Sequence, residues 1–126
     1  MSIPQHLRYT KDHEWVSVDG NVATVGITHY AQDQLGDIVF VDIDTVGRKL
    51  AAEAVFGSVE AVKTVSDLFL PVSGTILEKN AAIDASPETV NADPYGEGWM
   101  VRVEMDDPAQ VQGLLDAEAY RALIGE

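Results

Sequence analysis

Short apolar segments separated by turn residues run from Tyr9 to Val46 and predict short β-strands. Apolar residues cluster in 13–18 and again in 22–27, and each segment has the length and the valine content of a strand. The intervening Asp19-Gly20-Asn21 favours a tight turn, because glycine adopts the positive φ angle that such turns need. This part of the chain therefore predicts a β-hairpin.

A helical signal follows the hairpin. Thr28 is a suitable N-cap, since its hydroxyl can accept a hydrogen bond from an amide two or three residues later, and Gly36 is a natural stop. These two residues predict a short helix over 29–35. The next segment, 37–43, is a predicted strand whose apolar residues are consecutive rather than alternating. That pattern predicts burial on both faces of the strand.

Two more predicted strands, at about 54–62 and 65–72, lie on either side of Lys63. Residues 58–70 contain no glycine, proline or asparagine, so turn chemistry does not locate the bend between the two strands. The lysine stands among valines, with acidic residues at Glu60 and Asp67. Without further information, an ordinary solvated lysine is the default interpretation of Lys63.

The second half of the chain predicts fewer regular elements. A turn at 71–74 leads into a predicted strand at 75–79, and 99–103 alternates as a closing strand. The region between them, 80–95, contains several turn residues and is predicted to be irregular. Asp107 and Pro108 then predict the start of a helix, with aspartate at the cap and proline at the first helical position.

Composition restricts the partners of the chain. Its 126 residues, 46% of them hydrophobic, predict one compact domain over 1–126. The net charge of −13 would repel phosphate backbones and anionic lipid surfaces, so neither nucleic acid nor a membrane is expected as a partner. A protein with basic docking patches fits this charge better. The acidic surface also favours a monomer.

The chain has little chemistry of its own. It contains no cysteine, which excludes disulfides, a thiol nucleophile and a thiolate metal site. The three histidines do not share one helical face, so we predict no metal site. The N-terminus lacks a basic region followed by a long apolar run, which favours a bacterial cytoplasm or, as the alternative, a processed mitochondrial matrix chain.

An ordered set of short motifs covers the chain from Tyr9 to about Tyr120 and resembles one known family, the H proteins of the glycine cleavage system. The segments that carry the resemblance are Tyr9-Thr10, His13-Glu-Trp-Val16, Gly26-Ile-Thr28, Ala31-Gln32, Leu35-Gly-Asp-Ile-Val-Phe-Val41, Val46-Gly47, Glu60-Ala-Val-Lys63, Ser66-Asp67, Pro71-Val-Ser-Gly74, Asn91, Asp93-Pro-Tyr95, Gly98-Trp99 and Leu114-Leu115. Each is weak alone, and their order makes the set specific.

The resemblance implies a mainly β fold, a barrel-sandwich hybrid of antiparallel sheets of the lipoyl/biotinyl-carrier type, with short helices and a helical C-terminal region. It implies that lipoic acid is attached covalently to Lys63 at a hairpin tip, which places the missing bend. Glu60 and Val62 are then candidates for recognition by the lipoate-attaching enzyme. The family usually has Ser and Ala where this chain has Ala61 and Thr64. That departure could alter the recognition.

The resemblance further implies a non-enzymatic carrier in glycine catabolism and one-carbon metabolism. Glycine decarboxylase (P protein) loads an aminomethyl group on the lipoyl arm, aminomethyltransferase (T protein) passes the carbon to tetrahydrofolate, and dihydrolipoamide dehydrogenase (L protein) reoxidises the arm. A loaded arm benefits from shelter from water. The resemblance suggests Glu14 and Asp67 as carboxylates that hold its ammonium group.

Three alternatives stay open at this point. A lipoate relay or donor protein, or a sulfur-carrier-associated relative, would share the fold and the lysine. A biotin carrier typically presents Met-Lys-Met, whereas Val62 and Thr64 flank Lys63. An unmodified interaction module would retain the scaffold without any attached group.

Overall fold

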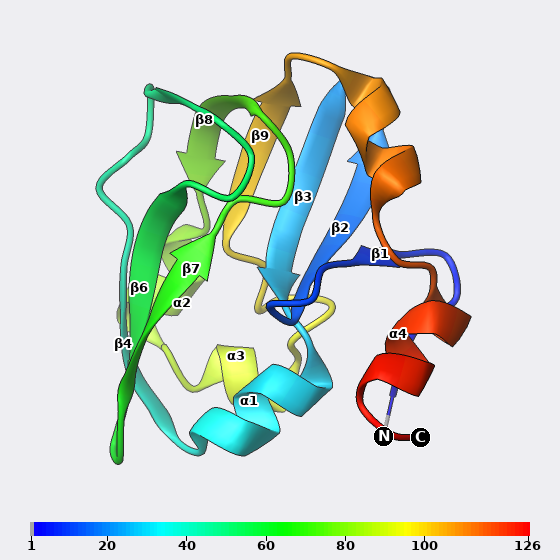
Figure 1. Ribbon diagram of the computed structural model, residues 1–126. Helices are drawn as coiled ribbons and strands as arrows, with labels where there is room; N and C mark the ends of the chain where they lie inside the picture. The colour runs from blue at the N-terminus through cyan, green and yellow to red at the C-terminus, as the bar shows by residue number, and fades with distance from the viewer. Residues whose placement is uncertain (1) are drawn as a thin grey trace.

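The structure is a computed structural model that describes residues 2–126, in which nine strands form two antiparallel sheets (Figure 1). The larger sheet has the strand order β1-β2-β3-β9-β8-β5 and the smaller one the order β4-β6-β7. The strand bounds are β1 Arg8–Tyr9, β2 Glu14–Asp19, β3 Val22–Ile27, β4 Ile38–Asp42, β5 Lys49–Leu50, β6 Val55–Ala61, β7 Val65–Phe69, β8 Gly74–Lys79 and β9 Val101–Met105.

The main hydrophobic core lies between the two sheets and takes side chains from both. Val25, Ile76 and Val103 contribute from the large sheet, and Val41 and Val59 contribute from the small one. All five are nearly inaccessible to water, and burial of such side chains stabilises the fold by roughly 1.5–3 kcal/mol each. The predicted architecture, a sandwich of antiparallel sheets with short helices, is confirmed.

The predicted N-terminal hairpin is formed by β2 and β3, whose residues pair from Glu14 with Ile27 to Asp19 with Val22. Its loop consists of Gly20 and Asn21, and Gly20 has a φ of 63°. A positive φ at the first position of a two-residue loop suits the right-handed twist of the strands, and glycine adopts it without strain. The local sequence signal was therefore sufficient here.

The predicted short helix is also confirmed, as α1 (His29–Leu35). The Thr28 side chain accepts a hydrogen bond from the Ala31 amide at 3.1 Å, and Gly36 ends the helix with a φ of 80°. The helix lies below the open end of the sheets in Figure 1, beside the turn that joins β6 and β7. Its two capping residues thus fix where the chain leaves the large sheet and where it enters β4.

The prediction that 37–43 is buried on both faces is wrong. In β4, Ile38 and Val41 are buried, whereas Val39 and Phe40 are 48% and 50% exposed. The strand lies at the edge of the small sheet, and an irregularity in its pairing with β6 falls between Ile38 and Phe40. Such a bulge turns successive side chains to the same side, so consecutive apolar residues do not imply two buried faces.

The prediction that the region 80–95 is irregular is only partly correct. It contains two short helices, α2 (Ala81–Ala85) and α3 (Thr89–Ala92). Asn80 caps α2 by accepting from the Ala82 amide, while its side-chain nitrogen donates to the carbonyls of Glu97 and Trp99. Helices of four or five residues carry too few apolar positions to show a helical period.

The C-terminal region folds back along the large sheet. The predicted helix start at Asp107 and Pro108 is a 3₁₀ helix, η1 (Pro108–Gly113), and the last helix is α4 (Ala117–Leu123). A second apolar cluster joins α4 to the N-terminal segment, where the ring of Tyr120 stacks on that of Tyr9 with their centroids 4.7 Å apart. The two ends of the chain therefore brace one side of the sheet that carries β2.

Candidate functional site

Lys63 lies exposed in the turn between β6 and β7. This turn is at the lower left of the ribbon in Figure 1. The two strands pair over their length, from Val55 with Phe69 to Glu60 with Val65. The bend at the lysine, which turn residues could not locate, is thus present. A paired hairpin holds the lysine out from the body of the molecule without exposing the core.

Contacts from outside the hairpin explain how this turn forms without glycine, proline or asparagine. The Ala61 amide donates to the Thr64 carbonyl at 2.8 Å, which closes the turn. The Val62 amide donates to the carbonyl of Asp37 at 3.0 Å, so the α1–β4 loop supports the tip. The bend is therefore stabilised by one hydrogen bond within the turn and one to a loop outside the hairpin, without the residues that usually favour turns.

Asn91 of α3 fixes the loop that supports the tip. Its side-chain oxygen accepts from the Ile38 amide at 2.9 Å, and its nitrogen donates to the carbonyl of Gly36 at 2.9 Å and to the side chain of Gln32 at 3.0 Å. One side chain thereby satisfies backbone groups on both sides of Asp37. Local sequence patterns do not predict this role, because the partners are more than fifty positions away.

The side chain of Lys63 passes close to Gly36. A Cβ atom at position 36 would lie 3.4 Å from Cε of the lysine and 3.9 Å from its Nζ. Gly36 also has a φ of 80°, a conformation that residues with a side chain rarely adopt. Glycine at position 36 is thus required by its backbone conformation, and the lysine side chain lies in van der Waals range of this helix end.

The two recognition candidates lie beside the lysine as predicted from their sequence positions. Val62 is 76% exposed, and Glu60 is exposed between its cross-strand partners Phe40 and Val65. Side chains of cross-strand partners lie on the same face of a sheet, so Glu60 has an apolar residue on each side. Neither residue is placed to act as a catalyst.

A cleft of about 310 Å³ lies between α1 and β7 and reaches β2. We call it the arm cleft. It is lined by Asp12, His13, Glu14, Ile27, Tyr30, Ala31, Gln34, Leu35, Val59, Ser66, Asp67 and Leu68. Half of these lining residues are apolar or aromatic, and among the rest there are three carboxylates and no lysine or arginine. The cleft therefore suits a slender apolar chain that ends in a cation.

The structure brings the two predicted acids, Glu14 and Asp67, to this same cleft, with very different surroundings. Glu14 is 2% exposed and comes from β2, whereas Asp67 is exposed on β7, where it also borders an acidic depression with Asp42. Both residues lie on strands, so their backbones are held by sheet pairing. Glu14 is the inner acid of the cleft and Asp67 the outer one.

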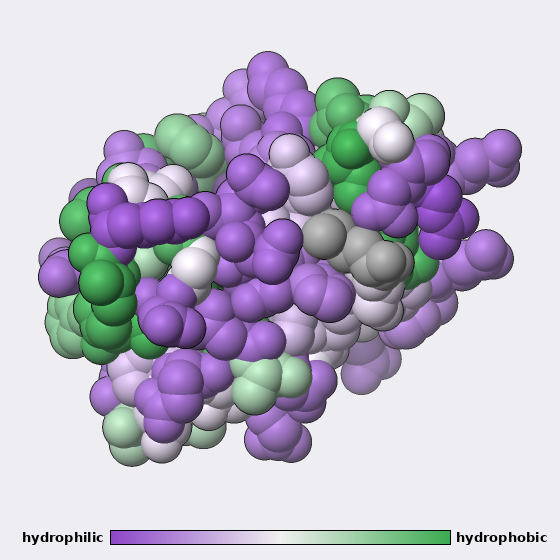
Figure 2. Space-filling view, turned by 90° about the horizontal axis from the view of Figure 1, so that it is seen from below, coloured by the Kyte–Doolittle hydropathy of each residue, from purple (hydrophilic) through white to green (hydrophobic). Residues whose placement is uncertain are grey.

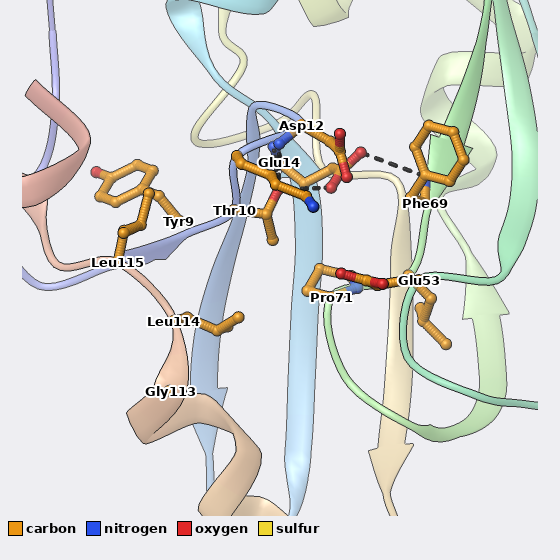
Figure 3. Close-up of a pocket in the computed structure, with 12 residues that line it drawn as sticks. Tyr9, Thr10, Asp12, Glu14, Glu53, Phe69, Pro71, Gly113, Leu114 and Leu115 are labelled. Carbon is orange, nitrogen blue, oxygen red and sulfur yellow. Dashed lines mark hydrogen bonds between the residues drawn. The ribbon is translucent and has the colours of Figure 1, made fainter. Parts of the chain in front are cut away.

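The carboxylate of Glu14 joins the two sheets (Figure 3). Its Oε1 accepts from the Thr10 hydroxyl at 2.7 Å, and its Oε2 accepts from the Phe69 amide of β7 at 3.3 Å. Burial raises the pKa of Glu14 from 4.5 to about 8, although both hydrogen bonds act in the opposite direction. The side chain is therefore largely protonated at pH 7 when no cation is near.

Glu14 also lines a second pocket, of about 260 Å³, shown in Figure 3. This pocket lies between η1, the 9–12 segment and the residues that follow β7. Its residues include Thr10, Glu53, Phe69 and Leu114. The Glu14 side chain lies between the two cavities, so it separates the arm cleft from the second pocket.

The sequence did not reveal how His13 contributes to the cleft wall. Its φ of 69° lies in the left-handed region, and its Nδ1 is 2.9 Å from the Tyr120 hydroxyl. The same hydroxyl is 2.8 Å from Oγ1 of Thr28, the N-cap of α1. Burial lowers the pKa of His13, so its imidazole is neutral at pH 7 and does not repel a cation beside Glu14.

The chain is similar to glycine cleavage H proteins along its whole length. The family model described as glycine cleavage H-protein matches residues 7–126. A glycine cleavage system H protein of Chlorobium limicola is 62% identical over 128 residues, with all of both chains covered. One of Bacteroides thetaiotaomicron is 58% identical over 124 residues, covering 98% of each chain.

The fold agrees with the sequence comparison. The crystal structure of a glycine cleavage system H protein from Mycobacterium marinum superposes with a TM-score of 0.90 at 42% identity. The match covers 98% of this chain and all of that one. In residues 2–126, none of the helices has the length and hydropathy needed to span a membrane.

Proposed function

The chain belongs to the glycine cleavage H-protein family and is a non-enzymatic lipoyl carrier of the glycine cleavage system, and we propose that Lys63 bears its lipoyl group. The observation that supports this position is the exposed lysine in the β6–β7 turn. An attaching enzyme can reach the Nζ atom there without unfolding the chain, and the stiff hairpin fixes the base of the arm.

Two of the other lysines are engaged elsewhere. Lys49 pairs with Asp106 at 3.6 Å and Lys79 pairs with Asp84 at 3.0 Å, both at positions within the large sheet. Their ammonium groups lie beside carboxylates rather than at a protruding tip. The remaining lysine, Lys11, follows β1 and borders the second pocket. The tip geometry thus favours Lys63 over the other three.

Intact mass measurement tests the attachment site. The purified chain is incubated with lipoate, ATP and a lipoate ligase, and modified peptides are mapped. Wild type and Lys79→Arg are expected to gain one lipoyl increment on Lys63, and Lys63→Arg is expected to gain none. An increment on Lys63→Arg, or a modified peptide that excludes position 63, would contradict the proposal.

Membership in the glycine cleavage system implies three enzyme partners: glycine decarboxylase (P protein), aminomethyltransferase (T protein) and dihydrolipoamide dehydrogenase (L protein). A lipoate-attaching enzyme is a fourth proposed partner, because the amide bond to Lys63 has to be made by another protein. We further propose that the carrier is a monomer and works in a bacterial cytoplasm, since the relatives described above are bacterial.

The arm cleft is the proposed shelter for the loaded arm. When bound, the lipoyl group supplies a disulfide ring that is reduced as it takes up the aminomethyl unit of glycine. The residues of this chain then hold the cargo: the apolar side chains of the cleft shield it from water, Glu14 binds its ammonium group at the inner end, and Asp67, at the rim on β7, adds negative charge. The cleft lies beside β7, the strand that follows Lys63, so a tether rooted at Lys63 starts close to it.

Glu14 gains a charge when it meets the cation. In the empty cleft its carboxyl is largely protonated at pH 7, because burial disfavours the charged form. A cation beside Oε1 or Oε2 favours the carboxylate, so the proton leaves Glu14 as the cargo enters. The ion pair then forms in a cleft with little water, where it is stronger than at the surface.

Replacing Glu14 with alanine removes the inner carboxylate from the cleft. We expect the loaded arm of isolated Glu14→Ala carrier to break down several-fold faster than that of wild type. The measurement follows release of formaldehyde and ammonia from loaded carrier after removal of the enzymes. The matched control is Glu104→Ala, an exposed acid on β9. An unchanged lifetime in Glu14→Ala refutes the arm-holding role.

A further inference from the structure

Exposed apolar side chains gather at one end of the small sheet. Among the described residues, nine large hydrophobic side chains are exposed, and four of them, Val39, Phe40, Val62 and Val65, surround the β6–β7 turn. We call these four residues the hairpin platform. Figure 2 looks onto this end of the molecule, and hydrophobic residues cluster there at the left, next to hydrophilic ones.

The sheet geometry explains why the platform faces solvent. Phe40 pairs with Glu60, and Glu60 pairs with Val65, so the three side chains form one row on the outer face. The next row on this face consists of Asp42, Ser58 and Asp67. The pairing irregularity after Ile38 turns Val39 outward as well. The core is already filled by other residues of the same strands.

The hairpin platform exposes more apolar surface than is expected of a surface that contacts only solvent. Val62 is 76%, Val65 64% and Phe40 50% exposed, and all lie next to an edge strand in a chain with a net charge of −13. Contiguous exposed apolar residues with a polar rim mark interaction surfaces. The acids on this face predict that the partner offers an apolar socket rimmed by basic residues.

We propose that the hairpin platform is the docking surface for the enzyme that attaches the lipoyl group, an inference that rests on the proposed role of Lys63. Attachment is the step in which Nζ itself reacts. The neutral amine attacks the carbonyl carbon of a lipoyl–nucleotide mixed anhydride, and the amide bond forms as the acyl–oxygen bond breaks. The nucleotide phosphate leaves with the electron pair, and the amine proton passes to solvent.

The position of the reacting atom selects this partner over the other three. An enzyme that acts on Nζ has to enclose the lysine, so its surface touches the residues around the turn. The glycine cleavage enzymes act on the far end of the arm and can reach it at a distance from its root. Phe40, the largest of the four side chains, pairs with Glu60, three residues before Lys63, and is the natural anchor.

Lipoylation kinetics test the proposal. Phe40→Ser and Val65→Ser are compared with Leu77→Ser and Val18→Ser, which remove side chains that are 44% and 47% exposed on the large sheet. Intact mass is followed over time with purified lipoate ligase, lipoate and ATP. We expect kcat/KM for the carrier to fall at least tenfold in Phe40→Ser, mainly through KM, and less than twofold in the two controls.

Thermal melts establish that each variant is folded. Wild-type kcat/KM in folded Phe40→Ser would overturn the docking surface while leaving attachment to Lys63 intact, whereas modification of Lys63→Arg would overturn the attachment site itself. Fully lipoylated Phe40→Ser is then assayed with glycine decarboxylase. Rates near wild type support an attachment surface, and a tenfold loss there with normal lipoylation would assign the platform to the decarboxylase and contradict the proposal.

Discussion

The hairpin tip and the arm cleft are both built on the small sheet, but they differ in their exposure to solvent. At the tip, Lys63 is exposed, and its position is set by backbone hydrogen bonds that the neighbouring amides donate to the carbonyls of Asp37 and Thr64. In the cleft, Glu14 is 2% exposed and its pKa is raised by burial. The tip depends on rigidity and access, whereas the cleft depends on exclusion of water. Changes in one region should therefore leave the properties of the other intact.

The largest effect on one region alone is expected from Glu14→Gln, which changes the arm cleft and leaves the hairpin tip intact. Below pH 4.5 the Glu14 carboxyl is protonated in both folded and unfolded chains. Between pH 4.5 and about 8 the unfolded chain ionises first, so folding becomes less favourable as pH rises; above about 8 the full cost is present. Glutamine cannot ionise, and its amide can still meet Thr10 and Phe69.

We therefore expect Glu14→Gln to be more stable than wild type at pH 9, by on the order of a few kcal/mol. The difference should shrink toward zero as the pH falls to 4.5. Urea unfolding at several pH values measures this, with lipoylation rate as the control for the tip. A stability difference independent of pH would show that burial does not hold Glu14 neutral.

Asn91→Ala weakens the support of the hairpin tip without changing the arm cleft. The change leaves the Ile38 amide and the Gly36 carbonyl without their partner, which costs about 1–3 kcal/mol of unfolding free energy. The loop beneath Val62 is loosened, so lipoylation of Lys63 should slow. The pH dependence of stability should match that of wild type, because Glu14 is untouched; loss of that dependence would mean the regions are coupled.

The smallest effect is expected from Tyr120→Phe, which removes the hydroxyl that supports His13 behind the arm cleft. That hydroxyl contacts both Thr28 and His13, so its loss should cost about 1 kcal/mol and lower the melting temperature by a few degrees. Tyr30→Phe, which keeps the ring that contacts His13, is the matched control. Equal melting temperatures for Tyr120→Phe and wild type would exclude a bracing role for α4.

Local signals predicted the elements whose stabilising contacts are local. Thr28 and Gly36 delimit α1 because capping acts within a few residues, and Gly20 predicts the β2–β3 loop for the same reason. The position of Lys63 in a turn came from the family resemblance instead. One hydrogen bond of that turn is donated to the carbonyl of Asp37, whose loop is held by Asn91, and no short window of sequence contains these partners.

Burial was the least predictable property. The apolar run through Val39 and Phe40 predicts a strand buried on both faces, but an edge position and a bulge turn these residues to solvent. Conversely, a glutamate such as Glu14 is usually exposed to solvent. Here it is among the most buried polar residues described, because β7 and the 10–12 segment cover it. Both outcomes depend on which strands become neighbours.

Glycine-dependent release of carbon dioxide shows whether Lys63 carries the working lipoyl arm, because the reaction requires a lipoyl arm on this chain. Wild type, Lys79→Arg and Lys63→Arg are each treated with lipoate, ATP and lipoate ligase and then assayed with the purified glycine cleavage enzymes. We expect wild type and Lys79→Arg to support equal rates and Lys63→Arg to fall to the rate without carrier. Release by Lys63→Arg at the wild-type rate would contradict the account.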